Sequence, residues 1–434
     1  MFTRRQTLAL GLAVPGLAAL AACGPNAAGG GGGGADADGT SSLRLTWWGN
    51  PTRNEKTTAV IEAFTAVDDT ISISEEPGEW SGYWDKLATQ AAAGDLPDVI
   101  QMDEKFLSEY GGRGALLDLA AAGLDTSAFA PGTVEVGEVP DKGLLAINAG
   151  LNAACIIVNP HVFEEAGVEL PDDSTWTWDS MRDLAAQITE KTPDGTYGMA
   201  QIGGVQAVFQ LFMRQLGQDQ YSADGVGFDA AAAKQLLDWS LTLQDTKAAP
   251  DASVSVEDSS KAMDQSLFAT GKVGMTMVWS NQVVAHDALI DGGVTVLRPP
   301  SLAGSAAEGE LWYKASMYWS VSAKTQNKEA ALKFVDFLVN SPEAGKVLSV
   351  ERGVPGNLDV REAITPDLDE ANLKAVTYLE TIEADLGAAP VVTPQGGGEF
   401  EAILTRVQQD VLFGSTDTAA GAQQLIDDLT SALS

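Results

Sequence analysis

Ten tryptophans, several of them beside polar side chains, are the residues in this 434-residue sequence best suited to recognising another molecule. The pairs expected at strand ends or in loops are Trp48 with Asn50, Glu79 with Trp80, Trp279 with Ser280, Trp312 with Tyr313, and Tyr318 with Trp319. An indole ring stacks on a flat CH face, and nearby amides, hydroxyls and carboxylates hydrogen-bond the groups at its edge. A sugar offers such faces edged by hydroxyls. A tryptophan can also fill a core, which we expect of Trp47, Trp178 and Trp239.

Two acidic residues and one arginine are further candidates for polar contacts. Asp103 and Glu104 follow an expected strand as direct neighbours, so their side chains start on opposite faces and do not suit a catalytic pair. We expect Asp103 to accept hydrogen bonds in a cleft and Glu104 to be solvated or to cap a helix. Arg352 either reaches the cleft or forms an ion pair on the surface.

The charge balance and the few cysteines and histidines exclude several functions. The chain has 60 acidic and 26 basic residues, a net charge of −34, so we expect it to bind neither nucleic acid nor an anionic membrane surface. Two cysteines and two histidines leave little room for a zinc, haem or iron–sulfur site, so we expect no metal and no cofactor. Cys155 lies in an apolar run and is expected to be a buried thiol.

The first 22 residues are predicted to be a signal peptide. Two arginines at positions 4 and 5 precede an apolar run, 8–22, that is too short to cross a membrane. The twin arginines leave Tat and Sec export both open.

The residues that follow predict a lipid anchor. Leu20-Ala21-Ala22-Cys23 resembles a bacterial lipobox, which makes Cys23 the expected lipidation site. The alternative is an ordinary secretory signal that contains a cysteine. Residues 23–42 would then be a lipidated cysteine and a glycine-rich tether.

Alternating and helical spacings of apolar residues predict a βαβ arrangement at the start of the folded body. The expected order is strand 43–48, helix 60–67, strand 71–74, a helix beginning at Trp80 with Tyr83 on the same face, and strand 96–103. Strands separated by helices form parallel sheets, in which ligands lie beyond the carboxyl ends of the strands. Trp48, Asn50 and Asp103 fall at such ends.

Motifs along the whole body, from Leu43 to Ser434, resemble the extracellular solute-binding proteins of carbohydrate ABC importers, the group that includes the maltose-binding proteins. The motifs that carry the resemblance are Thr46-Trp47-Trp48-Gly49, Ala92-Ala93-Gly94-Asp95-Leu96-Pro97-Asp98-Val99, Val158-Asn159-Pro160-His161-Val162-Phe163, Phe268-Ala269-Thr270-Gly271-Lys272-Val273-Gly274-Met275 and Ser341-Pro342-Glu343-Ala344-Gly345. The family usually has tyrosine where this chain has Val158.

This resemblance implies an α/β fold with two lobes and a hinge of several crossovers. The crossovers are expected near 149–153, 279–282 and 322–326. They divide the body into a first lobe, 43–150 and 282–324, and a second lobe, 151–281 and 325–434.

The resemblance also implies that the protein is not an enzyme. We expect it to bind an extracellular oligosaccharide between the lobes and to deliver it to an ABC transporter permease. It would be a monomer on the extracellular face of the membrane, attached through its lipid alone. The expected site is Trp48, Asn50, Trp80, Tyr83, Asp103, Trp279, Ser280, Trp312, Tyr313, Trp319 and Arg352. A lipid-anchored glycoside hydrolase is the alternative.

The charge of the sugar is a further question. Trp48–Glu55 is also similar to binders of plant cell-wall oligosaccharides, which are neutral or acidic. An acidic sugar needs a cation, for which Arg53, Lys314 and Arg352 are candidates. Because basic residues are so few, we favour a neutral sugar.

Overall fold

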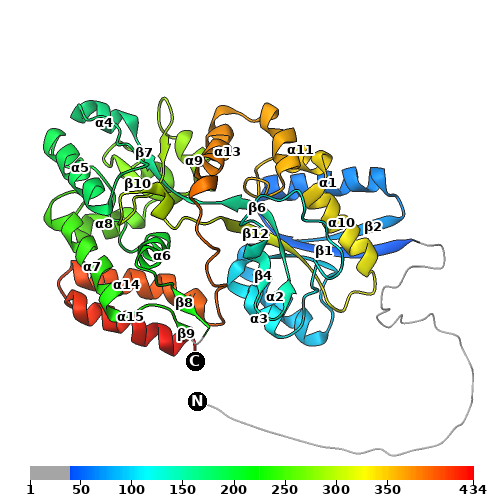
Figure 1. Cartoon of the computed structure of the whole chain (residues 1–434). Coiled ribbons are helices and arrows are strands. Elements are labelled where there is room, and N and C mark those ends of the chain that lie inside the picture. Colours follow the sequence, from blue (N-terminus) through cyan, green and yellow to red (C-terminus); the bar gives the residue numbers. More distant parts are fainter. Residues whose placement is uncertain (1–39, 224) are drawn as a thin grey trace, which may run out of the picture. The chain divides into compact units, whose positions relative to one another are not determined.

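The computed structural model describes residues 40–223 and 225–434, which form two main β-sheets covered by helices (Figure 1). The expected signal peptide, Cys23 and most of the expected tether lie outside these residues. The first strand begins at Ser41, so the last two residues assigned to the tether belong to the sheet. Within the described residues, no helix combines the length and the apolar character needed to span a bilayer.

The first sheet has five strands in the order β2-β1-β3-β12-β6. The strands are β1 (Ser41–Trp48), β2 (Ile71–Gly78), β3 (Val99–Met102), β6 (Ile147–Asn152) and β12 (Lys314–Val321). β1 is parallel to β2 and β3, which confirms the expected βαβ arrangement, whereas β12 is antiparallel to β3 and β6. The carboxyl ends of β1 and β3 therefore lie at the same edge of the sheet.

In the part of the chain that the structure describes, six helices and a small hairpin accompany this sheet. They are α1 (Pro51–Val67), α2 (Trp80–Ala93), α3 (Glu104–Gly112), α10 (Lys328–Asn340), α11 (Pro342–Leu348), α12 (Leu358–Ile364) and the strands β4 (Glu138–Val139) and β5 (Gly143–Leu144). Leu43, Leu45 and Trp47 of β1 share a hydrophobic cluster with Phe64 of α1 and Phe334 of α10. This alternate face of β1 is the one that the sequence pattern predicted to be buried.

The second sheet is formed by β10-β7-β11, with β7 in the centre and antiparallel to both neighbours. Its strands are β7 (Ala154–Val158), β10 (Met275–Trp279) and β11 (Thr295–Leu297), and β8 (Tyr221–Ser222) and β9 (Gly225–Val226) form a separate pair. All five residues of β7 are buried, as expected of an apolar central strand. They include Cys155, whose predicted burial is confirmed.

Within the described residues, nine further helices accompany the second sheet. They are α4 (Pro160–Ala166), α5 (Trp178–Lys191), α6 (Gln206–Gln215), α7 (Ala230–Asp245), α8 (Ala252–Ser259), α9 (Val283–Asp287), α13 (Glu370–Ile382), α14 (Phe400–Leu412) and α15 (Thr418–Ala432). Single 3-10 turns occupy η1 (Glu135–Gly137), η2 (Met263–Gln265), η3 (Ser280–Gln282), η4 (Ala306–Glu308), η5 (Thr365–Asp367), η6 (Glu383–Asp385) and η7 (Gly397–Glu399). The C-terminal α15 packs against α7 and α14 (Figure 1).

β6 and β12 lie side by side where the chain passes between the sheets (Figure 1). β6 belongs to the first sheet and leads through Ala153 directly into β7 of the second, which coincides with the crossover expected at 149–153. Ser316 interrupts the β6–β12 register, and its hydroxyl donates to the carbonyl oxygens of Gly150 and Arg352. A Cβ atom at Gly150 would collide with the Arg352 carbonyl, so this crossing requires glycine.

The other crossovers differ from those expected near 279–282 and 322–326. β11 still pairs with β7, so the chain leaves the second sheet only between β11 and β12. α10 and α11 share the hydrophobic cluster of β1, although we assigned residues 325–434 to the second lobe. α12 packs on α11 and α13 on α9, so the last crossing lies between α12 and α13. An apolar face predicts that a helix packs, but not which sheet it covers.

Candidate functional site

A cavity of about 240 Å³ gathers side chains from both sheets and from the segment before α14. It is lined by Asp103, Glu104, Lys105, Val205, Gln206, Ala207, Gln210, Trp279, Trp312, Lys314, Thr393, Gly397, Gly398 and Glu401. The carboxyl end of β3 contributes Asp103, the end of β10 contributes Trp279, and the start of β12 contributes Lys314. The cavity therefore lies where strand ends and crossovers meet.

Two indole rings form its aromatic wall. The centroids of Trp279 and Trp312 are 6.1 Å apart with an interplanar angle of 75°. Trp312 is 4% exposed, and the Arg214 guanidinium lies 5.4 Å from its ring centroid. Trp279 is only half-buried, so its ring surface remains available to a ligand. Such a wall suits the CH face of a sugar ring.

A lysine and two carboxylates lie together beside this wall. Lys314 Nζ is 3.0 Å from Glu104 Oε2 and 5.7 Å from the centroid of Trp279. Burial disfavours the ammonium form, but Glu104 and Asp103 more than compensate and raise the pKa of Lys314. Burial raises the pKa of Asp103 even though Lys314 opposes the shift. At neutral pH the lysine is therefore a fixed cation.

Helix starts position these acidic groups. Asp103 is the N-cap of α3, and its carboxylate accepts a hydrogen bond of 3.0 Å from the backbone N–H of Lys105. Glu104 is the first residue of the helix, where the dipole favours a negative charge. Because α3 begins directly after β3, the strand end fixes the direction of both side chains.

The other side of the cavity is formed by polar groups of α6, α14 and η7. Gln206 Nε2 donates to Gln220 Oε1 at 3.1 Å, and Gln210 lines the cavity although it is 8% exposed. The Gly397 carbonyl accepts a hydrogen bond of 2.7 Å from the Tyr221 hydroxyl. A Cβ at Gly397 would lie 2.9 Å from that hydroxyl oxygen, so glycine is needed for this close approach.

A sequence model of the bacterial extracellular solute-binding proteins matches residues 48–345. The chain belongs to this family. An uncharacterised lipoprotein of Streptomyces antibioticus is 25% identical over 352 residues, covering 77% of this chain and 73% of the relative.

Solved structures show the same fold. An extracellular solute-binding protein family 1 from Alicyclobacillus acidocaldarius superimposes with a TM-score of 0.78 at 26% identity, covering 91% of this chain and 98% of that one. A periplasmic oligogalacturonide binding protein from Yersinia enterocolitica has a TM-score of 0.78 at 20% identity, covering 91% and 100%. The family and the two-lobed periplasmic-binding-protein fold expected from the sequence are thus confirmed.

The predicted site residues of this solute-binding protein fall into separate groups. Trp279, Trp312 and Asp103 line the cavity together. Tyr313 is 1% exposed, and its hydroxyl donates to the Leu379 carbonyl at 2.9 Å. Ser280 is equally buried and accepts from the backbone N–H of Ala153 at 3.2 Å. These last two stabilise the surroundings of the wall rather than form it.

Trp48, Trp80 and Tyr83 belong to an aromatic cluster outside the cavity lining. The Trp48 ring lies 5.1 Å from both Trp80 and Tyr83, in edge-on contacts. Tyr83 is 3% exposed and donates to the Gln101 carbonyl at 2.7 Å, whereas Trp80 remains 45% exposed. The cluster continues through Trp84, which stacks on Phe106 at 3.8 Å. We had expected all three to line the cleft, but in the structure Trp48 and Tyr83 are core residues.

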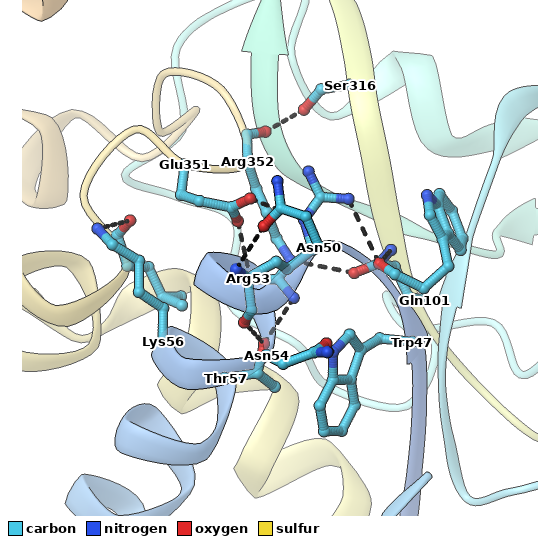
Figure 2. Close-up of polar contacts among 12 residues, drawn as sticks. Trp47, Asn50, Arg53, Asn54, Lys56, Thr57, Gln101, Ser316, Glu351 and Arg352 are labelled. Atoms are coloured by element: carbon cyan, nitrogen blue, oxygen red, sulfur yellow. Dashed lines mark hydrogen bonds and ion pairs between the residues drawn. The ribbon is translucent and has the colours of Figure 1, made fainter. Parts of the chain in front are cut away.

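Arg352, expected in the cleft, is instead the centre of a buried polar network (Figure 2). Its guanidinium donates to Gln101 Oε1 at 3.0 Å and to Thr57 Oγ1 at 2.7 Å, and it faces Glu351 at 3.4 Å. Burial lowers the pKa of Arg352 to about 9, against the opposing effect of Glu351, so the group stays charged at neutral pH. Arg53 also binds Glu351, at 2.8 Å.

Two further predicted residues lie around this network. Trp319 is 1% exposed, and its ring centroid is 5.1 Å from the Arg352 guanidinium. Asn50 is the N-cap of α1 and accepts from the backbone N–H of Arg53 at 2.9 Å (Figure 2). Neither lines the cavity. Trp319 lies inside β12 rather than at a strand end or in a loop. A tryptophan in a strand and an asparagine before a helix have structural uses that the sequence alone does not separate from binding.

Several lining residues were missed or assigned another role. Glu104 was expected to be solvated or to cap a helix, and Gln206, Gln210, Thr393 and Glu401 were not considered. Residues 395–399 resemble a loop that closes over ligand in relatives, with a plain flexible turn as the alternative, and Gly397 and Gly398 of this segment line the cavity. The polar residues of α6 carry no spacing that distinguishes them from a solvated helix face.

In residues 40–223 and 225–434, no three histidine, cysteine, aspartate or glutamate side chains lie close enough to hold a metal ion.

Proposed function

We propose that this protein binds an oligosaccharide in the cavity beside Trp279 and delivers it to the permease of an ABC importer. One observation carries the proposal: the Trp279–Trp312 wall, carboxylates and glutamine amides line a single cavity. Rings that stack on CH faces and polar groups that bind hydroxyls are what a sugar requires. Membership of the extracellular solute-binding family supports delivery to a permease.

The relatives support the same class of ligand. The Yersinia protein is described as binding oligogalacturonide, so this fold accommodates an oligosaccharide. The Streptomyces relative is a lipoprotein, which supports Cys23 as a lipid anchor that holds this protein at the extracellular face. The protein would act as a monomer and would not alter the bound sugar.

The proposal is tested by calorimetry and thermal unfolding with a panel of neutral and acidic oligosaccharides, together with their monosaccharides. A ligand that binds only the folded state raises the free energy of unfolding by RT ln(1 + [L]/Kd), and the melting temperature rises with it. We expect one oligosaccharide to bind at a stoichiometry of one and to be recovered intact. Shortened sugars in the chromatogram would identify a hydrolase instead, and a panel without any binding would contradict the proposal.

A further inference from the structure

The charged groups of the cavity have an acidic excess. Three carboxylates line it, from Asp103, Glu104 and Glu401, against two ammonium groups, from Lys105 and Lys314. The sign of the local charge decides which sugars can enter, because a uronic acid carries a carboxylate and a neutral sugar does not.

Lys314 is the cation that lies over the Trp279 ring, and it already forms an ion pair. Its Nζ lies 3.0 Å from Glu104, and Asp103 is a second negative group near it. The Asp103 carboxylate is itself fixed by its capping hydrogen bond to Lys105 N–H. A sugar carboxylate could bind Lys314 only by displacing Glu104 or by lying against it.

Lys105 is the second ammonium group of the lining, and it is a weaker partner for a sugar carboxylate than Lys314. Its side chain is 46% exposed and lies 4.0 Å from the Glu401 carboxylate. An ion pair made by so exposed an ammonium group is screened by water and salt. Lys105 therefore does not offset the carboxylates beside Trp279.

The arginines that could have bound an acidic sugar already form ion pairs and hydrogen bonds within the protein. Arg53 pairs with Glu351, and Arg352 is buried among Gln101, Thr57 and Glu351. Arg214 lies over the Trp312 ring and forms ion pairs with Asp219 and Glu310 at 3.3 Å each. No arginine side chain is part of the lining formed by the described residues.

We infer that Glu104, assisted by Asp103, is a specificity-determining residue that holds Lys314 and so restricts the cavity to uncharged sugars. A uronate bound at Trp279 would bring its carboxylate against Glu104 and Asp103, and like charges at an interface cost affinity. A neutral sugar can instead donate its hydroxyls to the same carboxylates and stack on the indole. This inference rests on the proposed function, since it concerns the ligand of that cavity.

The test compares Glu104→Gln with the matched control Glu109→Gln. Both remove one negative charge from α3, but Glu109 lies outside the cavity lining and pairs with Arg113 at 2.8 Å. Calorimetry at low and high salt measures the affinity of each protein for galacturonotriose and for neutral gluco-, xylo- and galacto-trisaccharides. Asp103→Asn is a second variant, because asparagine retains the N-cap.

We expect the wild type to bind a neutral trisaccharide at least about tenfold more tightly than galacturonotriose. Glu104→Gln should shift the ratio of the two affinities towards galacturonotriose by about tenfold, Asp103→Asn should shift it in the same direction, and Glu109→Gln should leave it unchanged. High salt should reduce the discrimination of the wild type.

Two results would overturn the inference while leaving the proposed function intact: tighter binding of galacturonotriose by the wild type, or an unchanged affinity ratio in folded Glu104→Gln and Asp103→Asn. Absence of binding by every sugar in the wild type would overturn both. Circular dichroism and thermal unfolding establish that each variant is folded.

Discussion

Trp279 is the single residue on which sugar affinity is expected to depend most, because its half-buried ring faces the cavity. Replacing it with alanine should weaken binding of the preferred oligosaccharide by about 1–3 kcal/mol, as for the truncation of an aromatic hot spot. Calorimetry measures the loss. Trp239→Phe is the control: Trp239 is a core residue, so that change should lower the melting temperature and leave affinity unchanged. If Trp279→Ala bound the oligosaccharide as tightly as the wild type, the Trp279 ring would not be part of the binding site.

Arg352 should matter for stability. Arg352→Met would leave Gln101 Oε1 without its buried donor, whereas Thr57 still donates to the Arg53 carbonyl and Glu351 keeps its ion pair with Arg53. Each orphaned buried group costs about 1–3 kcal/mol, so the urea midpoint should fall clearly. The exposed Arg113 provides the comparison, since Arg113→Met breaks only a surface pair and should cost about 0–1 kcal/mol. Similar losses of unfolding free energy in both variants would mean that the buried network around Arg352 adds little to stability.

Residue types and their neighbours predicted part of the site. Trp279, Trp312 and Asp103 were expected next to polar residues at strand ends or in loops, and all three line the candidate cavity. Trp319 and Arg352 have equally suitable chemistry but are buried against each other. The difference arises from β12 and the 349–353 turn meeting in space, and contacts between distant segments leave no local pattern.

At the scale of elements, strand and helix spacing predicted β1, β2, β3 and their parallel pairing, which depend on short connections. The same patterns did not predict that β12 lies next to β3, or that α10 and α11 cover the first sheet. An amphipathic element specifies which of its faces is buried. Its partner is decided by the packing of the whole chain.

β7 permits a prediction for its thiol. Cys155 lies in a fully buried strand, and burial raises the pKa of its thiol well above the ordinary value. In a Cys23→Ser variant, folded protein should therefore not react with Ellman's reagent at pH 7 or pH 9, because neither access nor the thiolate is available. One equivalent should react after denaturation in urea, which serves as the control. Rapid labelling of the folded protein would show that β7 opens to solvent.

At the scale of the whole molecule, the lipobox predicts an attachment that the described residues do not include. Cys23→Ala should abolish acylation, so the protein should be released from membranes or remain as an unprocessed precursor. Membrane fractionation and mass spectrometry of the N-terminus measure both results. The net charge of −34 disfavours retention on an anionic surface without the lipid. A variant that fractionates with the membrane and keeps the wild-type N-terminus would contradict lipidation.

The strand order β2-β1-β3-β12-β6 has a consequence for the order in which the chain folds. β3 and β6 are both made early, yet the strand that joins them, β12, follows the whole of the second sheet in sequence. Until residues 314–321 have emerged from the ribosome, two strand edges of the first sheet stay unpaired, and such edges can recruit other chains. The second sheet, whose strands lie between 154 and 297, can be completed before the first. The first sheet is therefore expected to complete its strand pairing later than the second.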